Sequence, residues 1–132
     1  MDTYQQGERV LPRENPWQGA SIGSDTLIAG EFLHPGLRLE SRSLKFAALM
    51  RRDGDFVVYR SNDWLQLWHS GTCGDPGAFL AVRDDGDLTV CTANGVQGWS
   101  SGTAGSPGAF AQLRDDGRLV VYSFYREPIW SS

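Results

Sequence analysis

Three stretches of the chain carry charged or polar side chains at every second position, beside an Asp-Gly pair. In an extended strand such alternate side chains share one face, so arginine donors would lie next to carboxylate acceptors. A face of this kind could hydrogen-bond a polar ligand, or its charges could pair with one another across strands in water. The three sets are Arg51, Asp53, Asp55, Val57 and Tyr59; Arg83, Asp85, Asp87, Thr89 and Cys91; and Arg114, Asp116, Arg118, Val120 and Tyr122.

Other combinations of reactive residues are scarce. His34 and His69 are far apart in the sequence and lie in turn-like contexts, which does not favour a metal site or a catalytic pair. The Asp-Gly-Asp stretches lack the twelve-residue spacing and closing glutamate of a calcium loop. The chain has neither a nucleophile elbow nor a phosphate-binding loop. We therefore expect no enzyme activity, no metal and no cofactor.

Composition narrows the possible partners. The 132 residues carry a net charge of −4, which disfavours binding to nucleic-acid phosphates and to anionic membranes. No apolar run approaches the roughly 20 residues that a membrane span needs. Residues 1–19 are polar and interrupted by prolines, without the apolar segment of a signal peptide. We nevertheless expect a secreted or extracellular protein that binds no nucleic acid and inserts into no membrane.

The sequence repeats itself three times. Trp68, Trp99 and Trp130 recur every 31 residues, and each follows a segment with an Asp-Gly pair. After the first two tryptophans, the segments GTCGDPGAF (71–79) and GTAGSPGAF (102–110) agree at seven of nine positions. We infer three units, at about residues 25–68, 69–99 and 100–132.

The repeat predicts an all-β domain. Asp-Gly between alternating apolar runs indicates a hairpin with a type I′ turn, and the alternation directs Phe56 and Val58 toward a core. No stretch shows a helical period. Three small sheets must share one core, so we predict a three-sided prism of four-stranded antiparallel sheets with pseudo-threefold symmetry and the tryptophans on its axis. This domain would span residues 23–132, and residues 1–22 would form an N-terminal arm.

The third sheet needs an additional strand, because the sequence ends just after Trp130. Residues 25–50 supply opening strands, so a strand of the same chain could complete it. A strand from a second chain could also do so, which would produce a homodimer by strand exchange.

The segment SDTLIAGEFLHPG (24–36), the Trp-x-Ser-Gly-Thr clusters and the Asp-Gly hairpins together resemble the bulb-type (monocot, snowdrop-like) mannose-binding lectin family. The resemblance covers about residues 24–132. It implies a β-prism II fold and mannose binding, without catalysis, by the pattern Gln-x-Asp-x-Asn-x-Val-x-Tyr on the outer face of each sheet.

This chain departs from that pattern in every unit. Arginine replaces Gln three times, the Asn position holds Asp55, Asp87 and Arg118, and Cys91 replaces one Tyr. The first unit keeps the most complete set, with Arg51 available to offset repulsion between Asp53 and Asp55. In the third unit Arg118 could favour an acidic or phosphate-bearing glycan, or could pair with Asp116. The second unit should not bind in the family's way.

The resemblance thus implies a lectin for mannose or mannose-containing glycans and glycoproteins, with degenerate sites. Apolar contact would come from Val57 and Tyr59. The alternative is a sugar-silent prism scaffold that makes protein–protein contacts through its outer faces, Trp64 or the arm.

Both cysteines depart from the repeat within the second unit. Cys73 stands where the next unit has Ala104, and Cys91 stands where the other units have tyrosine. This coincidence favours a disulfide between Cys73 and Cys91, while two unrelated thiols are the alternative.

Overall fold

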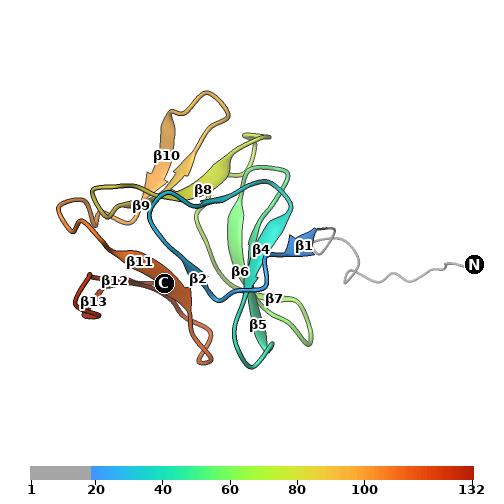
Figure 1. Ribbon diagram of the computed structural model, residues 1–132. Coiled ribbons are helices and arrows are strands. Elements are labelled where there is room, and N and C mark those ends of the chain that lie inside the picture. The colour runs from blue at the N-terminus through green and yellow to red at the C-terminus, as the bar shows by residue number, and fades with distance from the viewer. Residues whose placement is uncertain (1–18) are drawn as a thin grey trace, which may run out of the picture.

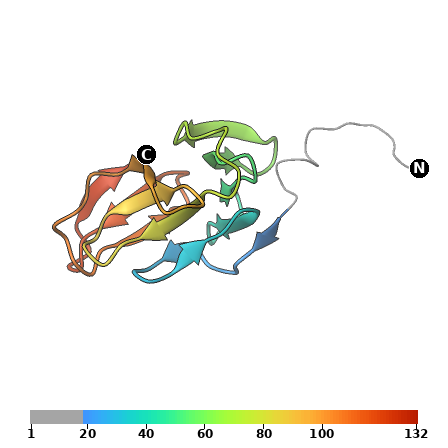
Figure 2. The same ribbon diagram turned by 90° about the horizontal axis from the view of Figure 1, so that it is seen from above.

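Thirteen short strands and no helix make up residues 19–132 of the computed structural model, the part of the chain that the structure describes. The strands form three sheets around a common centre (Figures 1 and 2). The first sheet has the order β1(Ala20–Ser21), β4(Leu37–Glu40), β5(Phe46–Met50), β6(Phe56–Arg60), β7(Leu65–His69). The second has the order β10(Gln97–Ser100), β9(Leu88–Cys91), β8(Phe79–Val82), β3(Phe32–Leu33). The third has the order β13(Pro128–Ser131), β12(Leu119–Tyr122), β11(Phe110–Leu113), β2(Thr26–Leu27).

The all-β prism of three sheets is confirmed, with one correction to the strand count. The first sheet has a fifth strand, because β1 pairs in parallel with β4 through Ala20 and Leu37 and through Ser21 and Arg38. All other pairings in the described residues are antiparallel. Residues 20–21 belong to the segment predicted as an arm, and residues 1–18 of that segment lie outside the described residues.

Two strands near the start of the described chain close the sheets formed by the later units. β2 pairs with β11 of the third sheet, and β3 pairs with β8 of the second sheet. The third sheet is thus completed by a strand of its own chain, the first of the two predicted possibilities. Strand exchange with a second chain stays a prediction.

The axis of the prism is aromatic, as the repeat predicts. Trp68, Trp99 and Trp130 contact one another edge to face, with ring centroids 5.3–5.4 Å apart and interplanar angles of 67–72°. Edge-to-face contact brings the positive edge of one ring to the negative face of the next. Phe56 and Val58 are fully buried in the surrounding core, as their alternation predicts.

The Asp-Gly turns differ in type from the prediction. A type I′ turn requires positive φ at both central residues, whereas only the glycines have it here: Gly54 (96°), Gly86 (93°) and Gly117 (88°). Gly54 N–H donates to the Arg51 carbonyl and Arg51 N–H donates to the Asp55 carbonyl. These bonds describe a three-residue loop, a type I turn followed by glycine in a bulge. The Asp53 carboxylate accepts the Asp55 N–H at 3.1 Å and fixes the turn.

Candidate functional site

Each sheet has an outward face made by alternate residues of its middle strands. We call these the first, second and third faces, after their sheets. Directly opposed outward pairs recur at equivalent positions of the three sheets. They are Leu49 with Val57 and Ala47 with Tyr59 in the first, Ala81 with Thr89 and Phe79 with Cys91 in the second, and Gln112 with Val120 and Phe110 with Tyr122 in the third.

On the first face the arginine joins an aspartate to the tyrosine. Arg51 donates from Nη2 to Asp53 Oδ2 at 2.6 Å and from Nη1 to the Tyr59 hydroxyl at 3.0 Å. The guanidinium fork suits this double contact, because its donors point in fixed directions. The structure therefore brings together three of the five residues predicted for this face.

The third face repeats the arrangement. Arg114 donates from Nε to Asp116 Oδ2 at 3.1 Å and from Nη1 to the Tyr122 hydroxyl at 3.0 Å. We call each of these two sets an Arg–Asp–Tyr triad. Asp116 pairs with Arg114, and Arg118 meets Asp116 only through its backbone N–H, at 3.1 Å. Of the two possibilities left open for Arg118, the side-chain pairing with Asp116 is therefore not found in this structure.

The second face has no triad. The Arg83 side chain makes no hydrogen bond or ion pair within residues 19–132, and Cys91 offers no hydroxyl at the tyrosine position. Asp85 accepts the Asp87 N–H at 3.0 Å, and the Cys91 thiol lies 3.4 Å from the Thr89 hydroxyl. Arg83 and Asp85 keep the sequence spacing of the other two units, but their side chains are not hydrogen-bonded to each other.

The charges of the triads stabilise one another. For Arg51 burial is the largest influence and acts to lower the pKa, but Tyr59 and Asp53 outweigh it and the pKa is raised. For Asp53 burial again acts most strongly, in the raising direction, yet the Asp55 N–H and Arg51 together hold the pKa below its usual value. Hydrogen bonding to Tyr122, followed by the charges of that tyrosine and Asp116, raises the pKa of Arg114. Both arginines and Asp53 are therefore charged at neutral pH.

Asp55 and Asp87 were predicted to face a ligand, but the structure uses them to hold loops. Asp55 is 6% exposed, and its Oδ1 accepts the N–H groups of Gly71 and Thr72 at 3.0 and 3.2 Å. Its Oδ2 lies 2.9 Å from His69 Nδ1. Burying a carboxylate requires such donors. The side chain is thus largely committed to the loop after β7.

Asp87 has the same role after β10. Its Oδ1 accepts the N–H groups of Gly102 and Thr103, both at 3.1 Å, and Ser100 Oγ lies 2.6 Å from Oδ2. The sequence contained a signal for this role. Ser-Gly-Thr follows Trp68 and Trp99, and in both of these units an aspartate, Asp55 or Asp87, stands two residues before the outward valine or threonine.

The faces also differ in the exposure of their apolar residues. Val57 and Tyr59 of the first face are 0% and 4% exposed, whereas Tyr122 of the third face is partly exposed. The predicted apolar contact from Val57 and Tyr59 is therefore restricted in this structure. The third face offers the more open tyrosine.

The third face contains residues that the sequence analysis missed. A pocket of about 410 Å³ lies beside Tyr122 and Arg114 and is also lined by Gln112 and Arg126. Gln112 Nε2 donates to Asp25 at 2.9 Å, and the Arg126 guanidinium lies 5.6 Å from the centre of the Phe110 ring. Gln112 stands two residues before Arg114, so strand alternation could have identified it.

The predicted disulfide is absent, because both cysteines are free. Cys73 is exposed and its thiol lies 3.5 Å from Asp53 on the first sheet's hairpin, while Cys91 is buried on the second face. The loop after β7 turns back over the preceding hairpin, where Gly74 N–H donates to the Asp53 carbonyl at 2.8 Å. The repeat alignment placed both cysteines in one unit, but this loop contacts the sheet of the unit before.

No group of three metal-binding side chains occurs within residues 19–132. The same part of the chain contains no helix that could cross a membrane.

Solved structures with the same fold were found by comparison, although no family model matches and neither does any curated protein. The Marasmius oreades lectin superposes with a TM-score of 0.78 at 21% identity, over 86% of this chain and 94% of that one. A monomeric monocot mannose-binding lectin from Gastrodia elata gives 0.74 at 28% identity, over 83% and 96%. The mannose-specific agglutinin of snowdrop (Galanthus nivalis), complexed with methyl-α-D-mannoside, gives 0.69 at 28% identity, over 76% and 90%.

The three sheets define a β-prism II fold, which the snowdrop agglutinin shares. The resemblance to the bulb-type mannose-binding lectins is confirmed, and this chain is related to that family. Its structural neighbours are lectins, a class of carbohydrate-binding proteins without enzyme activity.

Proposed function

We propose that this protein is a carbohydrate-binding lectin that recognises mannose or mannose-containing glycans through its third and first faces. The observation that carries the proposal is the Arg–Asp–Tyr triad, which recurs on two sheets with the same 3.0 Å arginine–tyrosine bond. Mannose-binding neighbours at 28% identity add support.

The triad offers the groups that a sugar needs. On the third face Arg114 and Asp116 are 47% and 45% exposed, so a guanidinium donor and a carboxylate acceptor are available side by side. Vicinal sugar hydroxyls both donate and accept, and they can bond the two groups together. Gln112 adds an amide on the neighbouring strand, where the pocket lies.

A single site of this size should bind weakly, because a monosaccharide buries little surface. Two faces on one chain could engage two branches of a glycan and raise the apparent affinity. The proposed partners are therefore branched mannose-type glycans on glycoproteins.

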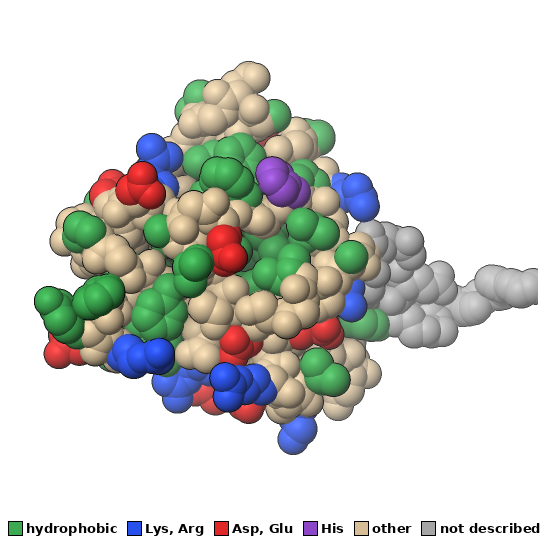
Figure 3. Space-filling view, in the orientation of Figure 1, with side chains coloured by type: hydrophobic (Ala, Val, Ile, Leu, Met, Phe, Trp, Pro, Cys, Tyr) green, Lys and Arg blue, Asp and Glu red, His purple; other side chains and the backbone are tan. Residues whose placement is uncertain are grey.

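The alternative, a sugar-silent scaffold, has one observation in its favour. Phe124 and Tyr125 in the β12–β13 turn are 67% and 81% exposed. In the space-filling view, hydrophobic side chains lie on the side of the third sheet, as they do elsewhere on the visible face (Figure 3). Exposed adjacent aromatics are typical of protein contact surfaces.

Calorimetric or NMR titration with methyl α-mannoside and mannobiose tests the proposal. We expect roughly millimolar binding that weakens about tenfold in Asp116→Ala, because a charged hydrogen-bond partner of the sugar is lost. Tyr122→Phe should weaken it less, and Asp63→Ala, in the exposed turn between β6 and β7, should leave it unchanged. A folded protein that binds no mannoside would refute the lectin and favour the scaffold.

A further inference from the structure

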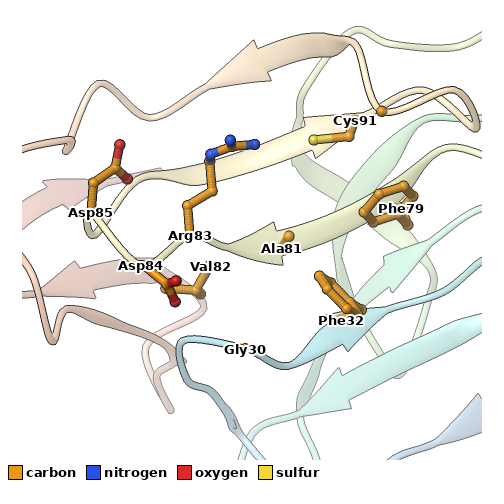
Figure 4. A pocket seen from close by; sticks show the side chains of 10 residues that line it. Gly30, Phe32, Phe79, Ala81, Val82, Arg83, Asp84, Asp85 and Cys91 are labelled. Atoms are coloured by element: carbon orange, nitrogen blue, oxygen red, sulfur yellow. The ribbon is translucent and has the colours of Figure 1, made fainter.

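The second face, which lacks the triad, contains a hollow of about 580 Å³. Phe32 and Phe79 stand at one end, and Arg83 with Asp85 stands at the other (Figure 4). Ala81 lies between the two ends on β8, and Cys91 lies beside them on β9.

The hollow exists because two side chains of its floor are small. Ala81 occupies the position of Leu49 in the first sheet and of Gln112 in the third. Cys91 occupies the position of Tyr59 and Tyr122. At these two positions the second sheet therefore lacks the bulk that the other two sheets place there.

The walls of the hollow are aromatic and accessible. Phe32 is 50% exposed although it lies on a strand, and its ring meets that of Phe79 edge to face with centroids 5.6 Å apart. The first sheet has Arg38 at the position of Phe32, and the third sheet has Thr26. An exposed phenyl ring beside a small-residue floor favours an apolar group of the ligand, such as a methyl.

The polar end of the hollow has unused donors. The Arg83 guanidinium has no hydrogen-bond or ion-pair partner within residues 19–132, in contrast to those of Arg51 and Arg114. Asp84 and Asp85 also line this end, so a ligand anion would meet two carboxylates and be repelled. A neutral acceptor such as an amide carbonyl suits Arg83 better.

We propose that the hollow binds a sugar that carries an acetamido group, an N-acetylhexosamine. The acetamido carbonyl accepts from Arg83, the methyl packs on Ala81 and Cys91 against the two phenyl rings, and a ring hydroxyl donates to Asp85. The proposal rests on the proposed function, that the chain binds carbohydrates, and assigns to the second face a different sugar from that of the other two.

Backbone-amide NMR of the 15N-labelled chain tests the proposal with matched sugars. The methyl glycosides of N-acetylglucosamine and N-acetylgalactosamine are compared with those of glucose and galactose, which lack only the acetamido group. We expect at least one acetamido sugar to shift the signals of Ala81, Arg83 and Cys91, and to bind at least tenfold more tightly than its parent sugar. Equal binding of both acetamido sugars and their parents would overturn the proposal.

Two substitutions should fill the hollow with larger side chains that occur at the equivalent positions of the other sheets. Ala81→Leu and Cys91→Tyr introduce residues that the prism already holds at equivalent positions, and each should weaken acetamido-sugar binding at least tenfold. Asp63→Ala, in the exposed turn between β6 and β7, is the control and should leave that binding unchanged. Thermal unfolding of each variant verifies its fold, and unchanged binding in both folded filling variants would contradict the proposal.

Methyl α-mannoside, titrated into the same sample, separates this proposal from the general one. If the mannoside shifts signals of Val120 and Tyr122 while no acetamido sugar shifts the second face, the hollow proposal fails alone. If no sugar shifts any face of the folded chain, both proposals fail.

Discussion

The three units are alike along the axis of the prism but differ on its outer faces. On the axis the three tryptophan pairs have centroid distances within 0.1 Å of one another, from 5.3 to 5.4 Å. On the outside, the first and third faces have an Arg–Asp–Tyr triad, whereas the second face has a hollow lined by an arginine whose side chain is unpaired within residues 19–132. Where the units pack against one another, a change in one must fit the other two, whereas each outer face meets solvent separately. The repeat thus constrains the scaffold and leaves the faces free to differ.

The largest effects should come from the axis and should be alike in all three units. Trp68→Ala, Trp99→Ala and Trp130→Ala each remove one ring from the same cluster, and each should cost about 3 kcal/mol of unfolding free energy. Urea denaturation measures this cost. A difference of more than about 1.5 kcal/mol among the three variants would break the equivalence of the units on the axis.

Removing the carboxylate that holds the loop after β10 should have an intermediate effect on the unfolding free energy. This effect should be larger in the second unit than in the third. Asp87→Ala leaves the N–H groups of Gly102 and Thr103 without their acceptor, which should cost about 2 kcal/mol. Asp87→Asn keeps an acceptor oxygen and should recover most of that loss.

Asp116→Ala is the control on the third sheet, where the carboxylate is exposed and pairs with Arg114. It should change the unfolding free energy by less than about 0.5 kcal/mol. Equal costs for Asp87→Ala and Asp116→Ala would show that the buried carboxylate does not anchor its loop.

The smallest effect concerns the charge of the first face. Burial acts most strongly on Asp53 and would raise its pKa, but the Asp55 N–H and Arg51 lower it overall. A folded pKa below the unfolded one means that the charged carboxylate stabilises the fold above the unfolded pKa. This stabilisation is lost as the pH falls through the folded pKa.

Arg51→Gln should therefore raise the pKa of Asp53, as followed by the carboxyl carbon in an NMR titration. Arg60→Gln removes a comparable arginine from the exposed pair with Asp63 and should not move it. An Asp53 pKa unaffected by Arg51→Gln would show that the arginine contact is not formed in solution.

The sequence predicted the scaffold well because its determinants are local or periodic. Tryptophan spacing, strand alternation and the Asp-Gly pairs each report on a unit by itself. The parallel pairing of β1 and the joining of two-residue strands β2 and β3 to distant sheets depend on contacts between remote residues. Such short segments have too few side chains to show a period.

The site was predicted less completely, for a related reason. Alternation correctly put Arg51, Asp53 and Tyr59 on one face, but it could not tell that Asp55 would turn toward Gly71 and Thr72, because that loop returns from sixteen residues away. The predicted disulfide failed in the same manner, since the loop of Cys73 packs on the preceding hairpin. The turn type was wrong because the Asp53 side chain accepts the N–H of Asp55, two residues on, and favours a longer loop.

The closure of two sheets by β2 and β3 has a consequence for how the chain acquires its fold. Thr26 pairs with Gln112, and Phe32 pairs with Ala81. During synthesis these early strands must therefore wait, with unpaired edges, until segments made much later leave the ribosome. Pairing across such sequence distances slows folding. Such a prism cannot fold one unit at a time, as an open repeat array can. Its first sheet can form before the strands that pair with β2 and β3 have been synthesised.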